Sequence, residues 1–203
     1  MGRLIVDEWM TLDGVVQAPG NGREDTDGGF AHGGWHWPHV DAITDDWVVA
    51  TTREAAAFLF GRRTYEIFAA YWPTAGASHP ELAGPLNERP KYVASTTLAE
   101  PLEWTHSHLL RGPVPEAVAT LRNTQDGDIH LVGSAALART LVTHDLVDEY
   151  RLFIEPVRVG GGKRFLPDDG ALRRLRLIDS RVTTTGVIIA TYRPHDPQKE
   201  EIE

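Results

Sequence analysis

The chain has 203 residues, the length of one ordinary domain with a buried core, and its content of 41% hydrophobic and 24% charged residues is that of a globular protein. It contains no cysteine, which excludes disulfides, thiolate nucleophiles and cysteine-ligated zinc. Acidic residues outnumber basic ones by 29 to 20, and the formal charge of −9 disfavours nucleic acid as a partner. Without a membrane-length apolar run or a signal-peptide pattern, the sequence predicts a cytoplasmic protein that does not enter a membrane.

Hydrophobic periodicity predicts strands that alternate with helices, with a long glycine-rich irregular stretch at Gly14–Pro38. In chain order, the predicted elements are a strand at Arg3–Trp9, a helix at Asp41–Thr52, a strand at Ala57–Phe60, a helix at Arg63–Tyr71, a strand at Lys91–Ser95, a short strand around Leu109-Leu110, a helix at Val114–Arg122, a strand at Asp128–Val132, a helix at Ser134–Thr143 and a strand at Glu149–Val159.

The C-terminal part predicts two consecutive strands, Leu172–Thr184 and Val187–Arg193, joined by a turn at Thr185-Gly186. Helical crossovers earlier in the chain favour a parallel sheet, whereas consecutive strands favour an antiparallel hairpin. The sequence therefore predicts a single α/β domain over residues 1–194, with a mostly parallel central sheet, an antiparallel C-terminal edge hairpin and a frayed polar tail at 195–203.

Two predicted strand-to-helix junctions have features of anion sites. At Phe60-Gly61-Arg62-Arg63, two arginines occupy the first turn of a helix, where the helix dipole opposes positive charge unless an anion completes the site. At Val132-Gly133-Ser134, the glycine allows close approach of a ligand, and the small residues that follow leave backbone N–H groups accessible. The alternatives are that both arginines point to water and that Gly133 serves an ordinary turn.

A third strand end carries hydroxyl groups at Ser95-Thr96-Thr97. Such side chains hydrogen-bond a ribose or a 2′-phosphate, or they cap a turn.

The order of these motifs resembles the dihydrofolate reductase superfamily, and in particular the branch related to the reductase domain of bacterial riboflavin biosynthesis. The resemblance covers roughly residues 3 to 193. The matching stretches are Leu4-Ile5-Val6, Thr11-Leu12-Asp13-Gly14-Val15, Gly61-Arg62-Arg63-Thr64-Tyr65-Glu66, Lys91-Tyr92-Val93-Ala94-Ser95, Val132-Gly133-Ser134-Ala135, Asp145-Leu146-Val147-Asp148-Glu149 and Pro156-Val157-Arg158-Val159-Gly160-Gly161-Gly162-Lys163-Arg164-Phe165.

The resemblance implies a three-layer reductase fold that binds NADPH, acts as a homodimer and transfers hydride to a C=N or C=O bond of a small, pterin- or pyrimidine-like substrate. By the same analogy, Thr11 and Asp13 are candidate catalytic residues at the pocket, and Tyr65 is a third candidate because it follows the arginine motif. The implied cofactor-binding residues are Gly14 beside the nicotinamide, Gly61, Arg62, Arg63 and Thr64 at the phosphates, Ser95 and Thr96 at the adenosine, and Val132, Gly133, Ser134, Ala135, Ala136 and Leu137 around the pyrophosphate.

The sequence departs from the family pattern at two places. Ser134 and Ala135 stand where many relatives have further glycines, and Val132 stands where riboflavin-pathway reductases commonly have an acidic residue. These departures keep open a non-catalytic nucleotide-binding sensor or assembly module, or a binder of a phosphorylated metabolite. Dihydrofolate reductases also use a pocket carboxylate, for which Asp41, Asp45 and Asp46 are the candidates.

Several remaining features favour structural interpretations. Asp13 is either a catalytic group or a turn aspartate. The histidines at 32, 36 and 39 lie in a stretch broken by proline and paired glycines, which favours a ligand-covering loop over a metal site. The run Gly160-Gly161-Gly162 predicts a bulged strand exit followed by solvated Lys163 and Arg164, and Asp148-Glu149 predicts a surface cap.

Overall fold

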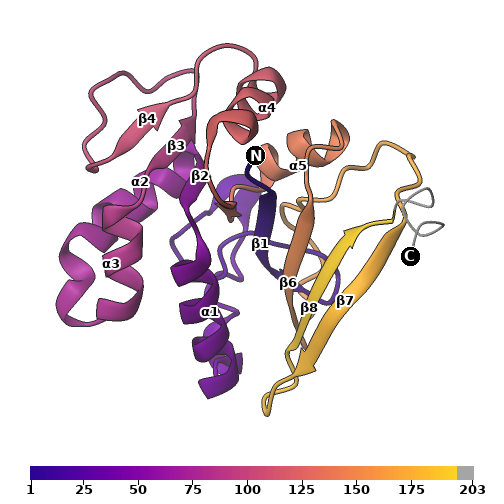
Figure 1. Cartoon of the computed structure of the whole chain (residues 1–203). Coiled ribbons are helices and arrows are strands. Elements are labelled where there is room, and N and C mark those ends of the chain that lie inside the picture. The colour runs from indigo at the N-terminus through magenta and orange to yellow at the C-terminus, as the bar shows by residue number, and fades with distance from the viewer. Residues whose placement is uncertain (196–203) are drawn as a thin grey trace.

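A computed structural model describes residues 1–195 and shows one eight-stranded sheet with the strand order β4-β3-β2-β5-β1-β6-β8-β7 (Figure 1). All pairs are parallel except β6–β8 and β8–β7, which confirms the predicted mixed α/β sheet with an antiparallel edge. The strands are β1 (Leu4–Thr11), β2 (Ala57–Gly61), β3 (Lys91–Ala94), β4 (Ser107–Leu109), β5 (Ile129–Val132), β6 (Glu149–Glu155), β7 (Leu175–Val182) and β8 (Ile188–Pro194).

Helices cover both faces of the sheet, with the β7–β8 hairpin at one side of the molecule and α3 and β4 at the other (Figure 1). Side chains of α1, α2 and α3 pack on one face, and those of α4 and α5 pack on the opposite face. Among residues 1–195, no helix combines the length and apolar character that crossing a membrane requires. The helices are α1 (Ala42–Glu54), α2 (Arg62–Tyr71), α3 (Pro80–Glu88), α4 (Val114–Thr124) and α5 (Ala135–Thr143), with short 3-10 turns at Asp27–Gly29, Trp37–His39 and Trp72–Ala77.

The observed elements differ from the predicted ones in three places. Helix α3 was not predicted because its sequence contains Pro80 and Pro85, yet Pro80 lies in the first turn, where a missing N–H costs no helical hydrogen bond. Strand β6 ends at Glu155 because Pro156 has no N–H to continue the ladder. Strand β7 is shorter at both ends than predicted, and all but His195 of the predicted tail lies outside the described residues.

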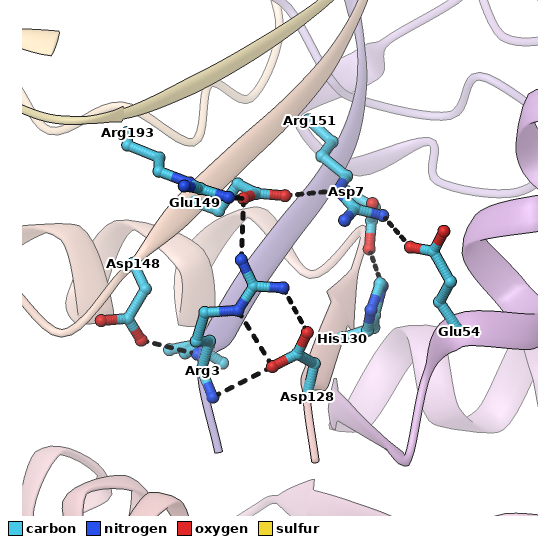
Figure 2. Close-up of polar contacts among 10 residues, drawn as sticks. Arg3, Asp7, Glu54, Asp128, His130, Asp148, Glu149, Arg151 and Arg193 are labelled. Atoms are coloured by element: carbon cyan, nitrogen blue, oxygen red, sulfur yellow. Dashed lines mark hydrogen bonds and ion pairs between the residues drawn. The ribbon is translucent and has the colours of Figure 1, made fainter. Parts of the chain in front are cut away.

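A buried ionic network fixes the amino-terminal ends of the central strands (Figure 2). Glu149, at the start of β6, accepts hydrogen bonds from Arg3, the residue before β1, at 3.2 Å, from Arg151 at 2.7 Å and from Arg193 of β8 at 2.9 Å. Burial raises the pKa of Glu149, but the guanidinium groups outweigh this effect and lower it overall. The surface cap predicted at Asp148-Glu149 is therefore wrong, because Glu149 is the centre of a network that joins three strands.

We expect Glu149→Gln to lower the free energy of unfolding by about 3 kcal/mol at neutral pH, because three guanidinium groups lose their buried partner. Since folding lowers the pKa of Glu149 below its ordinary value of 4.5, its contribution is present above that pH and disappears as pH falls through the lowered pKa. Urea titrations of both proteins between pH 3 and 7 should show the difference shrinking in acid.

Glu54→Gln is the matched control, because Glu54 also binds Arg151, at 3.0 Å, but its side chain is 59% exposed. We expect this change to cost about 1 kcal/mol or less. Equal losses for the two variants would contradict the role assigned to burial at Glu149.

Candidate functional site

A cavity of about 310 Å³ lies at the carboxyl ends of β2 and β5, beside the second half of β1. This is the edge at which ligands bind in open α/β sheets. The walls come from the end of β1, the loop after it, the first turns of α2 and α5, and Lys163. The lining residues are Glu8, Trp9, Val16, Gln17, Ala18, Pro19, Glu24, Asp25, Asp27, Gly61, Arg62, Arg63, Thr64, Ile67, Phe68, Val132, Gly133, Ser134, Ala135, Ala136, Leu137 and Lys163.

Two helix amino termini open into this cavity, and Ser134 joins them. The Gly61 N–H donates to Ser134 Oγ at 2.9 Å, and the same hydroxyl donates to Thr64 Oγ1 at 2.9 Å. Neither α2 nor α5 has a side chain that caps its first N–H groups. Uncapped N–H groups and the positive ends of two helix dipoles favour an anion at this point.

The backbone around Gly133 allows a ligand to approach closely. Gly133 has φ +58° and Ser134 has φ +65°, so both residues lie in the left-handed region. Only glycine enters that region without steric strain, and the strained Ser134 is held by its hydrogen bonds to α2 and its neighbours. The predicted cradle at 132–137 therefore lines the cavity, with Ser134 in a structural role that sequence reasoning did not assign to it.

Charged side chains form an ion-pair cluster at one wall. Arg63 binds both Asp25 and Asp27, and Lys163 binds Asp25 at 2.6 Å and Asp27 at 2.7 Å. The side-chain hydrogen bond from Arg63, followed by that from Lys163, lowers the pKa of Asp27 to about 2. Lys163 is thus not the solvated residue that the sequence predicted, because the loop after β1 brings two carboxylates to it. Arg62 also lines the cavity, and its guanidinium binds Glu66 at 3.1 Å on the exposed face of α2.

Glu8 is a carboxyl group that the sequence analysis missed. Its side chain on β1 is 2% exposed and lines the cavity, and Oε1 has no hydrogen-bond partner among the described residues. Burial, with a smaller effect from neighbouring Asp7, raises the pKa of Glu8 well above its ordinary value. The available signal was the adjacent pair Asp7-Glu8 within an otherwise apolar central strand.

The neighbouring β1 residues serve the opposite face of the sheet. Asp7 Oδ2 lies 2.7 Å from His130 Nδ1, and both side chains are buried (Figure 2). Trp9 stacks on Phe153 at a ring distance of 5.0 Å, and the edge of His36 approaches it at 5.7 Å. Trp9 also lines the cavity, so it contributes an aromatic surface there.

The structure places the predicted residues Thr11, Asp13 and Gly14 outside the cavity lining. Asp13 accepts hydrogen bonds from Thr11 Oγ1 at 2.6 Å and from the Gly160 N–H at 2.8 Å. The Thr11 hydrogen bond contributes most to lowering the pKa of Asp13 to about 2. These contacts favour the interpretation of Asp13 as a turn aspartate, because they hold its carboxylate between Thr11 at the end of β1 and Gly160 at the start of the three consecutive glycines.

The assignment of Tyr65 to the pocket is corrected. Tyr65 is buried in the core between α2 and β3, and its hydroxyl accepts from the Trp104 N–H at 3.1 Å. Ser95 and Thr96 also lie outside the cavity lining, and Ser95 Oγ accepts from the Leu98 N–H at 3.0 Å. Ser95 is therefore a turn cap in this structure.

The three aspartates near α1 do not supply a carboxyl group to the cavity. Asp41 is the N-cap of α1, where it forms a capping box with Thr44 and accepts from the Thr184 N–H at 2.8 Å. Asp45 and Asp46 follow on the same helix, and neither lines the cavity. In the loop before α1, His36 Nδ1 lies 2.7 Å from Glu155 Oε1, so this histidine binds β6.

Glu8→Gln tests the ionisation state of Glu8 without any ligand. Folding raises the pKa of Glu8, so the folded wild type keeps a proton that the unfolded chain releases above its ordinary value of 4.5. Wild-type stability should therefore fall as pH rises from about 4.5, by up to ~1.4 kcal/mol per pH unit, until Glu8 ionises in the folded state. The melting temperature of the variant minus that of the wild type should therefore increase by about 3–5 °C for each pH unit in that interval.

Thermal melts from pH 4.5 to 8 measure this difference. Glu116→Gln, which changes an exposed glutamate on α4, should follow the wild-type curve at every pH. A constant difference between Glu8→Gln and the wild type would contradict a protonated Glu8.

Comparison with known proteins identifies the family and the fold of the chain. Residues 3–189 match the family model of the RibD C-terminal domain. The chain is 28% identical over 192 residues to the uncharacterized protein YyaP of Bacillus subtilis strain 168, and the match covers 94% of each.

Two solved structures share the fold. A putative riboflavin biosynthesis protein from Shewanella sp. PV-4 has a TM-score of 0.73 and 20% identity over 96% of this chain and 99% of that one. Dihydrofolate reductase from Enterococcus faecalis, complexed with NADP(H) and RAB-propyl, has a TM-score of 0.62 and 16% identity over 96% of this chain and 98% of that one. Because the family model covers nearly the whole described chain, the protein belongs to the RibD C-terminal domain family.

Proposed function

We propose that the protein is an NADPH-dependent reductase that transfers hydride to a C=N or C=O bond of a small heterocyclic substrate. The observation that carries this proposal is the pair of uncapped helix termini, joined by Ser134, in a cavity that also contains the buried carboxyl of Glu8. Membership of the RibD C-terminal domain family and the shared fold of an NADP(H)-bound dihydrofolate reductase support the same class of reaction.

The cavity residues fit a dinucleotide. Backbone N–H groups at the starts of α2 and α5 would bind the pyrophosphate, and Gly133 has no side chain to obstruct it. NADPH, when bound, supplies the hydride, while the protein orients the reactants and provides a proton. Trp9 and Phe68 line the same cavity and offer aromatic surface to a planar substrate ring.

Of the two predicted arginines, Arg62 is the better candidate for a 2′-phosphate. Its present partner, Glu66, is an exposed residue one helical turn away, and exposed ion pairs of this kind contribute little energy. Arg63 is held by two carboxylates of the loop after β1. We therefore assign cofactor selection to Arg62 and fastening of the loop to Arg63.

Arg62→Gln should weaken NADPH binding about tenfold or more, because a charge-assisted hydrogen bond to phosphate is lost. Binding of NADH, which lacks the 2′-phosphate, should change little. Tryptophan fluorescence quenching or the rise in melting temperature with each nucleotide measures both affinities.

Arg53→Gln is the matched control, since Arg53 is also an exposed helical arginine paired with a glutamate, Glu81 at 3.5 Å, and does not line the cavity. If millimolar NADPH fails to bind the wild type, the proposed function is wrong. Tight NADPH binding without oxidation on a panel of pterins, pyrimidines and carbonyl compounds would instead favour the non-catalytic sensor.

We also propose that the protein forms a homodimer through β7. This strand is at the edge of the sheet, and all eight of its side chains are exposed. Leu175, Leu177, Ile178 and Val182 are among them. A long edge strand with exposed apolar side chains is a template for pairing with another chain, and in a stable protein such an edge is normally covered.

Leu177→Glu combined with Val182→Glu should convert a dimer to a monomer, because the paired edge would bury like charges. Size-exclusion chromatography with light scattering measures the mass. Thr120→Glu, at an exposed polar position of α4 and not on β7, is the control for added charge. A monomeric wild type at micromolar concentration would contradict the dimer.

A further inference from the structure

We propose that Glu8 is the proton donor of the reduction, an inference that rests on the proposed function. Its carboxyl group lines the same cavity as the cradle at 132–137. Because side chains alternate along a strand, Glu8 lies on the sheet face of Leu4 and Val6, which is the face that α5 covers. The same strand therefore presents an acidic group to the cavity that the α5 cradle opens into.

The surroundings of Glu8 favour its neutral acid form. It is buried, Oε1 has no hydrogen-bond partner among the described residues, and its sequence neighbour Asp7 adds negative charge. A buried carboxyl without a counterion keeps its proton, because desolvation disfavours the charged form.

The other charged groups of the cavity have their own partners. Asp25 and Asp27 bind Arg63 and Lys163, and Arg62 binds Glu66. Within residues 1–195, no hydrogen bond or ion pair joins any of these cations to Glu8. The cationic groups of the cavity therefore do not neutralise a Glu8 carboxylate.

Two other carboxyl groups near this end of the sheet, half-buried Glu24 and buried Glu155, serve different purposes. Glu24 also lines the cavity, but its Oε2 accepts from the Gly20 N–H at 2.6 Å and the Asn21 N–H at 3.1 Å, so it is held as part of the loop. Glu155 binds His36 and does not line the cavity. Glu8 is thus the cavity carboxyl whose proton is not committed to a structural hydrogen bond.

The proposed step balances in atoms and charge. The carbon of the substrate C=N or C=O bond gains a hydride, with its two electrons, from the reduced nicotinamide. The O–H bond of Glu8 breaks as its proton forms a new N–H or O–H bond on the heteroatom. Glu8 is left as a carboxylate beside an oxidised, positively charged nicotinamide ring, and it takes a proton from water before the next cycle.

This placement predicts that the ionisation of Glu8 is coupled to the relative affinity for NADP⁺ and NADPH, which can be measured without knowing the substrate. A donor to the atom next to the hydride-accepting carbon lies within a few ångströms of the nicotinamide ring. The ring is cationic in NADP⁺ and neutral in NADPH, so ionised Glu8 should strengthen NADP⁺ binding selectively by roughly tenfold or more. Both nucleotides carry the 2′-phosphate and the pyrophosphate, and both meet the same other charged residues of the cavity. Titration of these groups therefore largely cancels in the ratio of the two affinities.

The test measures the affinities of NADP⁺ and NADPH from pH 5 to 9 for the wild type, Glu8→Gln and the control Glu116→Gln. We expect the preference for NADP⁺ to increase with pH in the wild type and the control, and to stay constant in Glu8→Gln. If NADPH binds the wild type but the ratio shows no such dependence, Glu8 is not beside the ring and the inference is overturned while the proposed function stands. If neither nucleotide binds, both are overturned.

Turnover provides a second readout with any compound that the wild type reduces. Glu8→Gln should lower kcat roughly 100-fold or more at neutral pH, with NADPH affinity changed less than about twofold, because general acid catalysis contributes on that scale. Glu8→Asp, which keeps an acid on a shorter side chain, should recover part of the rate. An unchanged kcat in Glu8→Gln would overturn the inference even if the nucleotide arm supported it.

Discussion

The candidate site depends on the contact of Ser134 with the start of α2. The residue adopts a left-handed backbone conformation that costs energy for any side chain other than glycine. That conformation turns the chain sharply from β5 into α5 and places the hydroxyl within 2.9 Å of the Gly61 N–H. The contact holds two helix amino termini side by side, so their first-turn N–H groups face one cavity. Relatives with glycine here would avoid the strain, but glycine lacks the hydroxyl that ties the helices together.

The central strand β1 places two acidic residues, Asp7 and Glu8, in an interior where charge is costly, and their surroundings differ. Successive side chains point to opposite faces, so Asp7 meets His130 on the α1 side, and Glu8 points to the α5 side. Asp7 acquires a partner at 2.7 Å, whereas Glu8 Oε1 acquires none among the described residues. An unpaired buried acid reduces stability, and such groups concentrate at functional sites. The unpaired Glu8 is therefore a physical reason to place the candidate site at this end of the sheet.

The sequence was sufficient to predict the alternating elements, the edge hairpin and the two strand-to-helix junctions, because these features are local. It was not sufficient for contacts that join distant segments. The sequence neighbours of Lys163 predict a solvated side chain, yet Asp25 and Asp27 bind it from more than 130 residues away in the chain. Tyr65 follows the phosphate motif, but Thr64, Ile67 and Phe68 share the cavity side of α2, and Tyr65 is about 100° further round the helix. The sequence did not predict Glu8 because its candidate carboxyl groups, Asp41, Asp45 and Asp46, lie at α1, whereas the acid of the cavity comes from β1.

The proposed phosphate-binding part of the site and the acid Glu8 require opposite electrostatic surroundings, and the fold places the unneutralised positive groups apart from Glu8. Phosphate binding requires positive potential, which the helix termini and Arg62 supply at the α2–α5 junction. A neutral acid requires that no cation be paired with it, since a nearby guanidinium would favour the carboxylate and withdraw the proton from use. Asp25 and Asp27 meet the second requirement by neutralising Arg63 and Lys163 within the same cavity wall, and they leave the helix termini and Arg62 as the source of positive potential. In the proposed function, the acidic loop after β1 therefore lets a cationic phosphate site and a protonated carboxyl occupy one cavity.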